Sequence, residues 1–124
     1  MNRTWTLVIP APAPLISLNQ RLHWAKRNTL TQAWRTAGYY AAYKAKLPKR
    51  DVQRASTTGY VHKTTRRRYD VHNLMPTFKA IIDGALVDYL FLPDDSNEYL
   101  TGPDLRVGSV MPATTIRLTI TEEA

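Results

Sequence analysis

Cysteine is absent from the 124-residue sequence, which excludes disulfide bonds and thiolate metal ligands and favours a reducing compartment. The chain also has no apolar run near the roughly 20 residues that cross a bilayer. Its start, Met1 to Trp5, lacks the apolar stretch of a signal peptide. These absences and the short length predict a single domain, residues 1–124, of a cytoplasmic protein that makes no membrane contact.

Acidic residues are nearly missing from the first part of the chain. Residues 1–68 hold 14 of the 17 Lys and Arg but only one of the ten Asp and Glu, a formal charge of +13. The remainder holds three cationic and nine acidic residues, a charge of −6, which leaves the net +7 and a pI near 9.9. This separation predicts a basic surface for a polyanion beside an acidic centre. A solvated basic face without a partner is the plainer alternative.

The hydrophobic pattern predicts strands over residues 4–9, 52–63, 98–100 and 115–121, of which the last alternates most strictly. Helices are predicted over 23–46 and 74–88. The first helix has a narrow face of mostly small residues, Leu30, Trp34, Ala37, Ala41 and Ala45; the stripe of the second is Leu74, Phe78, Ile81, Ala85 and Tyr89. This order of elements predicts an α+β fold, a small mixed β-sheet with two main helices packed on one face.

The segment RRRYDVHNL, residues 66–74, places three arginines directly before side chains that bind metal ions. In an extended segment, side chains two residues apart point to the same side, so Asp70 and His72 can converge on one ion. Asn73 is suited to cap the second helix, and Pro76 suits its first turn, where a missing N–H costs little. The segment therefore predicts a metal site just ahead of a helix.

Further polar residues follow at spacings that could complete the site. Lys79 and Asp83 share a face of the second helix, and Asp94 and Asp95 lie in the loop after it. Carboxylate oxygens suit Mg²⁺ or Mn²⁺, which orients and acidifies a water, while an ammonium group stabilises charge on a phosphate. The predicted hydrolytic site comprises Asp70, His72, Lys79 and Asp95 as catalytic residues, with Asp70, His72, Asp94 and Asp95 as metal ligands.

Each of these residues also has a plainer interpretation. Asp70 could form a salt bridge with the arginines, and His72 could simply pack or cap. Lys79 and Asp83 could be a surface ion pair contributing about 0.3–0.5 kcal/mol. The Pro-Asp-Asp segment at 93–95 could be an ordinary turn. A single phosphodiester site is preferred because it accounts for all of these residues together.

This set of motifs resembles the RusA family of Holliday junction resolvases, in the form found in phages and prophages. The family has a run of the form R-R-D-x-D-N-L, a helix with a lysine and a D-A/G-L segment, and a downstream D-D. Here RRRYDVHNL, Lys79, DGAL at 83–86 and LPDD at 92–95 match that order. LVIPAPAPLISLNQRLHW near the start and IRLTITE near the end resemble the family's first and last strands.

The resemblance implies a homodimeric, Mg²⁺- or Mn²⁺-dependent endonuclease that resolves four-way DNA junctions and acts on branched DNA in recombination and repair. A bacterial or phage-infected cell is its implied location. Asp70 and Asp95 match the family's metal-binding aspartates, and Asn73 matches its asparagine. Lys79 corresponds to the catalytic lysine, although it lies three residues further along the helix, almost one turn.

His72 is the departure from the family, because an aspartate is expected at this position. Imidazole replaces a hard, charged oxygen donor with a borderline one that suits Mg²⁺ less well. His72 could bind a softer ion such as Mn²⁺, or act as a base near neutral pH, or mark a weakened site that binds DNA and hardly cuts. The first two outcomes are preferred, since the other site residues are all present.

DNA contacts are predicted from the basic residues of the first part. The arginine run would bind phosphates, joined by Asn73 and by basic residues near the first helix; the set is Arg66, Arg67, Arg68, Asn73, Arg21, Lys26 and Arg27. A basic DNA-binding module without cleavage is the main alternative, supported by tyrosines and tryptophans among the cations. An HNH nuclease is disfavoured because no histidine follows His72.

Overall fold

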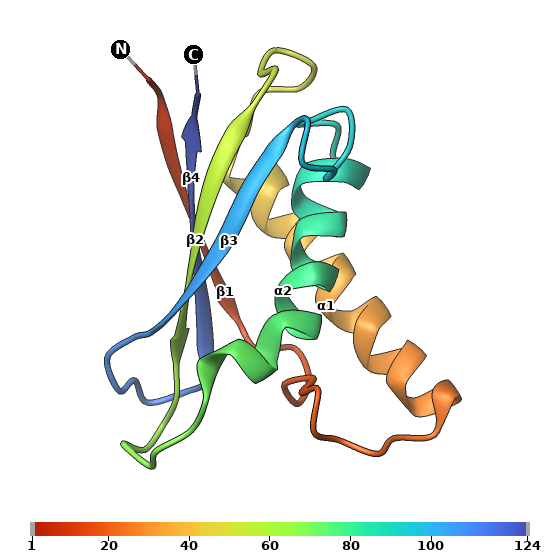
Figure 1. Cartoon of the computed structure of the whole chain (residues 1–124), viewed down its shortest axis with the longest axis vertical. Helices are drawn as coiled ribbons and strands as arrows, with labels where there is room; N and C mark the ends of the chain where they lie inside the picture. Colours follow the sequence, from red (N-terminus) through yellow and green to blue (C-terminus); the bar gives the residue numbers. More distant parts are fainter. Residues whose placement is uncertain (1, 124) are drawn as a thin grey trace.

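A computed structural model describes residues 2–123 and shows a mixed four-stranded sheet with both long helices on one face (Figure 1). The elements in chain order are β1 (Thr4–Pro10), α1 (Trp24–Ala45), β2 (Ala55–His62), the 3₁₀-helix η1 (Val71–Leu74), α2 (Met75–Ile82), the π-helical η2 (Asp83–Asp88), β3 (Leu100–Val107) and β4 (Thr115–Glu122). The predicted α+β class is confirmed, and so is the predicted order of elements.

The sheet has the strand order β1-β4-β2-β3. The pairs β1–β4 and β4–β2 are antiparallel, whereas β2 and β3 are parallel. Parallel neighbours require a crossover, which here consists of η1, α2 and η2. This crossover brings the loop after β2 and the loop after β3 to the same end of the sheet (Figure 1).

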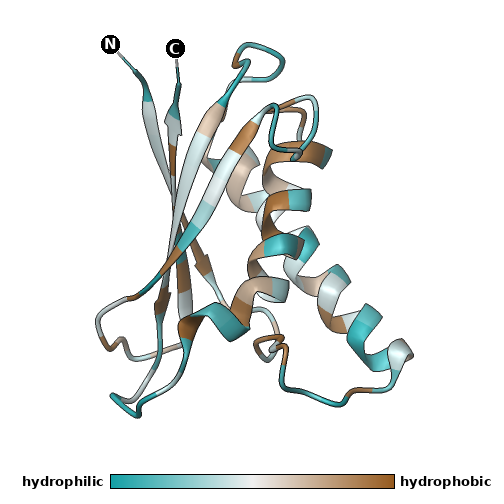
Figure 2. Ribbon diagram, in the orientation of Figure 1, coloured by the Kyte–Doolittle hydropathy of each residue, from teal (hydrophilic) through white to brown (hydrophobic). Residues whose placement is uncertain are grey.

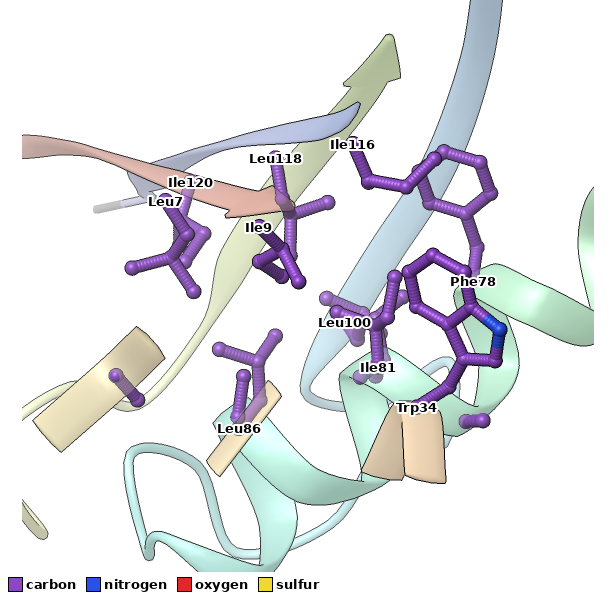
Figure 3. Packing of buried hydrophobic residues seen from close by; sticks show 14 of the residues in the cluster. Leu7, Ile9, Trp34, Phe78, Ile81, Leu86, Leu100, Ile116, Leu118 and Ile120 are labelled. Carbon is purple, nitrogen blue, oxygen red and sulfur yellow. The ribbon is translucent and has the colours of Figure 1, made fainter. Parts of the chain in front are cut away.

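The core lies between the sheet and the two helices. Strict alternation in β4 turns Ile116, Leu118 and Ile120 toward the helices, where all three are fully buried. Figure 3 shows these side chains, with those of β1, facing residues from α1 and α2 such as Trp34 and Phe78. Burial of this apolar surface is the main stabilising contribution to the fold.

The predicted apolar stripe of the second helix is confirmed. Its five residues, Leu74, Phe78, Ile81, Ala85 and Tyr89, are all buried, although the helix is α-helical only to Ile82 and continues as η2. Within residues 2–123, no helix combines the length and the apolar composition needed to cross a membrane.

The predicted packing face of the first helix was only partly right. Leu30 and Trp34 are buried as predicted, but the face continues through Gly38 and Ala42, and Ala45 is exposed. Alanine and glycine differ little in hydrophobicity, so the pattern could not determine which of the small residues face inward. A Cβ on Gly38 would lie within 2.5 Å of the Ile81 carbonyl oxygen, so α1 and α2 pack backbone against backbone.

The predicted short strand at 98–100 was wrong. Glu98 lies in a turn, and the strand β3 begins at Leu100 and runs to Val107. Its Gly102-Pro103-Asp104 segment is typical of turns, and proline cannot donate a ladder hydrogen bond. An edge strand tolerates proline because one of its sides has no partner, and β3 is at the edge of the sheet.

Candidate active site

The segment after β1 is clamped against both helices. The Thr77 hydroxyl accepts a hydrogen bond from the Ile16 N–H at 2.8 Å and donates one to the Ile16 carbonyl at 2.9 Å. The indole N–H of Trp34 donates to the Pro14 carbonyl at 2.9 Å. The Leu18 N–H donates to the carbonyl of Asn73 at 2.8 Å. These bonds hold residues 14–20 alongside η1, where they form one wall of a hollow.

Asp70 and His72 are neighbours, as the sequence predicted, but the predicted extended conformation was wrong, because His72 lies in the 3₁₀-helix η1. Asp70 caps η1, because its Oδ1 accepts the His72 N–H at 3.0 Å. The same oxygen is 3.4 Å from His72 Nδ1, and the two side chains are 61% and 71% exposed. The prediction that Asn73 is the helix cap was wrong: Asn73 lies within η1, and the extra 3₁₀ turn moves the cap to Asp70.

A hollow of about 350 Å³ opens beside Asp70. Its lining comes from the segment after β1, from both ends of the arginine loop and from η1: Leu15, Ser17, Asn19, Gln20, Lys63, Tyr69, Asp70, Asn73 and Leu74. We call it the Asp70 hollow. Its polar lining of amides, two hydroxyls, a carboxylate and an ammonium can bind a charged, hydrogen-bonding ligand.

A second polar group surrounds Lys79 on α2. Its ammonium donates to Asp83 Oδ1 at 3.1 Å, one helical turn away, and also to Asp95 from the following loop. The groove beside it measures about 560 Å³ and includes Met75, Leu100 and the Gly102-Pro103 edge of β3. The loop after η2 therefore returns to α2, as the sequence predicted, and brings Asp95 there, whereas Asp94 is exposed.

Charge pairing shifts the titration of this second group. Burial alone would lower the pKa of Lys79, but its bonds to Asp95 and Asp83 outweigh burial and raise that pKa above the ordinary lysine value. The hydrogen bond from Lys79 is the largest cause that lowers the pKa of Asp95 below the ordinary aspartate value. Lys79 is thus held cationic and Asp95 anionic at neutral pH.

We expect Asp95→Asn to destabilise the protein by about 0.5–1 kcal/mol at pH 7, a small value because the Lys79 side chain is 57% exposed. Since the folded-state pKa of Asp95 is lowered, its stabilisation is complete above the unfolded-state value near 3.9 and is lost as pH falls through the folded value. Urea unfolding of both proteins from pH 7 to pH 2 measures this difference. A difference that stays constant down to pH 2 would contradict the pairing.

The arginine run occupies the exposed loop between β2 and η1. Arg66, Arg67 and Arg68 make no ion pair or side-chain hydrogen bond with any residue from 2 to 123. Arg21 comes just before α1, and Lys26 and Arg27 lie in its first turns. This start of α1 is at the same end of the molecule as the arginine loop (Figure 1). Figure 2 shows hydrophilic residues along both segments. The predicted DNA-contacting residues therefore lie at one end.

A third hollow separates the arginine loop from the loop after β3. It measures about 320 Å³ and is lined by Lys63, Thr65, Arg66, Arg67, Tyr69, Val107, Gly108, Ser109 and Val110. We call it the basic cleft. Lys63 and Tyr69 line both this cleft and the Asp70 hollow, so the two lie side by side.

The structure thus distributes the predicted site residues between two groups. Asp70, His72 and Asn73 form one, and Lys79 with Asp95 forms the other; Asp83 joins the second group. Among residues 2–123, no three His, Asp or Glu side chains gather closely enough to hold one ion. Sequence reasoning missed Lys63 as a site residue, because its place depends on how β2 and β3 pair.

No protein-family model and no curated protein matches this chain.

Proposed function

We propose that the protein is a metal-dependent, structure-selective endodeoxyribonuclease that nicks four-way junctions and other branched DNA, a resolvase of the RusA type. The observation that carries the proposal is the exposed Asp70–His72 pair, of which Asp70 lines a hollow beside a cleft whose cations form no ion pair within residues 2–123. A metal-dependent phosphodiester hydrolase needs two components, cations that bind phosphates and donors that bind a divalent ion, and here they lie side by side.

The donors suit Mn²⁺ or Mg²⁺. Asp70 Oδ1 and His72 Nδ1 lie 3.4 Å apart and are exposed, so both are accessible to an ion. Such ions are often held by only one or two protein carboxylates together with substrate phosphates and waters. When bound, the ion would supply an activated water and charge stabilisation at the phosphate. Asp95 and Asp94 remain proposed further ligands.

This chain's other residues have defined tasks in the proposal. The arginine loop binds the DNA backbone, and Asp70 and His72 would hold the divalent ion beside it. Lys79 is held cationic by its carboxylate partners and is the proposed donor of positive charge to the reacting phosphate. Two nicks related by a two-fold axis require two sites, so we propose a homodimer. We place it in the cytoplasm of a bacterial or phage-infected cell.

The test uses a four-way junction with each strand labelled in turn, incubated with the protein in Mn²⁺ or in EDTA. We expect Mn²⁺-dependent nicks at symmetric positions in two opposite strands, with a linear duplex of the same sequence left intact. Binding of the junction without metal-dependent nicks would reject the nuclease and favour a DNA-binding module.

We expect Mn²⁺ to support faster cleavage than Mg²⁺, because His72 provides a nitrogen donor where an oxygen donor would favour Mg²⁺. A His72→Asp variant should reverse or abolish this preference. Cleavage rates across a titration of each metal measure it. The matched control is His23→Asp, which lies at the α1 cap, where aspartate also caps well, and should keep the wild-type preference. Equal or faster wild-type cleavage in Mg²⁺ would contradict the role given to His72.

Replacing Arg66, Arg67 and Arg68 together with alanine should weaken junction binding by about 100-fold or more at low salt. Three lost phosphate contacts should also reduce the slope of log K against log salt by about 2–3. Fluorescence anisotropy at several salt concentrations measures both. The fold should survive, since all three side chains are exposed. An unchanged slope would show that the arginines do not bind phosphates.

A further inference from the structure

The basic cleft has walls that are fixed by hydrogen bonds between the two loops. The Gly108 N–H donates to the Val61 carbonyl at 2.8 Å, and the Met111 N–H donates to the Lys63 carbonyl at 3.0 Å. The buried His62 ring adds a bond from Nδ1 to the Ser109 carbonyl at 2.9 Å. The ends of β2 and β3 thus keep the two walls at a set separation.

The lining carries only positive charge. Lys63, Arg66 and Arg67 contribute three cations, and no aspartate or glutamate lines the cleft. The Lys63 ammonium lies 3.8 Å from the centroid of the Tyr69 ring, while the two arginines have no ion-pair partner in the part of the chain described. The charge complementarity therefore calls for an anionic ligand.

The opposite wall carries two accessible apolar side chains beside Gly108 and Ser109. Val107 is 60% exposed and Val110 is 43% exposed, although both lie beside cations. An anion without apolar surface would leave these valines in contact with water. A nucleotide combines a phosphate with a flat base that stacks on apolar and aromatic side chains. In a duplex the base faces are covered by neighbouring pairs, so only an unstacked nucleotide can use this wall.

We propose that the basic cleft holds one unpaired nucleotide, with its base against Val107 and Val110 and its phosphate at Arg66 and Arg67. The adjoining Asp70 hollow would then receive the next phosphate of the same strand. This inference rests on the proposed function in taking DNA as the ligand. It adds that the protein selects branched DNA by capturing a base that has left its stack.

The test measures binding in EDTA, so that it does not depend on cleavage. The probes are a short single-stranded oligothymidylate and the same strand with abasic sugars in place of its nucleotides. Each is titrated against wild type, against the Val107→Ser/Val110→Ser variant and against Val8→Ser. Val8 is a matched control because it is 58% exposed and lies on β1. All three substituted valines are exposed, so the variants should fold, which circular dichroism would verify.

Loss of the bases should weaken wild-type and Val8→Ser binding about tenfold, and Val107→Ser/Val110→Ser binding by about twofold at most. Equal wild-type affinity for both probes, or no binding of either, would overturn the inference. The inference would also be overturned if removing the bases weakened binding to the Val107→Ser/Val110→Ser variant as much as to wild type, because the base would then bind elsewhere. Junction cleavage combined with any of these results would leave the proposed nuclease intact. Base-dependent binding through the valines without cleavage would reject only the nuclease.

Discussion

Asp70→Asn is expected to lower Mn²⁺-dependent junction cleavage by about 100-fold or more while leaving junction affinity within about threefold. The substitution removes a charged metal donor but keeps an oxygen that can accept the His72 N–H, so η1 remains capped. The side chain is 61% exposed, and stability should therefore change by less than about 0.5 kcal/mol. The loss of activity would then come from the site and not from unfolding.

The measurement compares single-turnover cleavage rates at saturating protein, with affinity determined separately in EDTA. Asp104→Asn is the matched control, because Asp104 is also an exposed aspartate that accepts hydrogen bonds, here from Arg106 on β3. It should cleave at the wild-type rate. A wild-type rate for Asp70→Asn would show that the proposed donor is not needed.

Gly84→Ala should destabilise the protein by about 3 kcal/mol or more. A Cβ at this position would overlap the backbone carbonyl of Arg35, and neither backbone can move without separating α1 from η2. The bidentate ion pair between Arg35 and Asp88, at 2.6 and 2.8 Å, holds the same two elements together. Since the fold depends on this close approach, one methyl group should have a large effect.

Urea unfolding followed by circular dichroism measures the change in the free energy of unfolding. Gln32→Ala is the control, because Gln32 is an exposed residue of α1, and its substitution should change stability by less than about 0.5 kcal/mol. Failure of the Gly84→Ala variant to fold would agree with the expectation. Stability within about 1 kcal/mol of wild type would contradict the backbone-to-backbone packing.

The sequence predicted those elements whose pattern has strong hydrophobic contrast. Ile116, Leu118 and Ile120 alternate with polar residues, and the stripe of α2 repeats at three and four residues, so both elements were predicted correctly. The extent of β3 was predicted wrongly, because its Gly102-Pro103 pair is typical of turns and only its place at the sheet edge makes a strand possible there. The inward face of α1 was predicted only in part, because its alanines and glycine differ little in hydrophobicity and give a weak hydrophobic pattern.

In the candidate site, too, the sequence predicted the local features and not those that depend on how the strands pair. The Asp70–His72 and Lys79–Asp83 neighbours depend on short spacings, which local geometry determines. The basic cleft depends on the parallel pairing of β2 with β3, which places Lys63 opposite Val107 to Val110. No spacing in the sequence encodes that pairing. The joining of Asp70 with Asp95 at one ion stays a prediction.

The central claim is that Asp70 and His72 would hold the divalent ion on which cleavage of DNA depends. A crystal structure of the protein with Mn²⁺ and a non-cleavable junction tests it most directly, through the anomalous scattering of the metal. We predict a peak within about 2.0–2.6 Å of an Asp70 oxygen and a His72 nitrogen. A Mn²⁺ ion held elsewhere, for example by Asp83 and Asp95 without Asp70, would contradict the account.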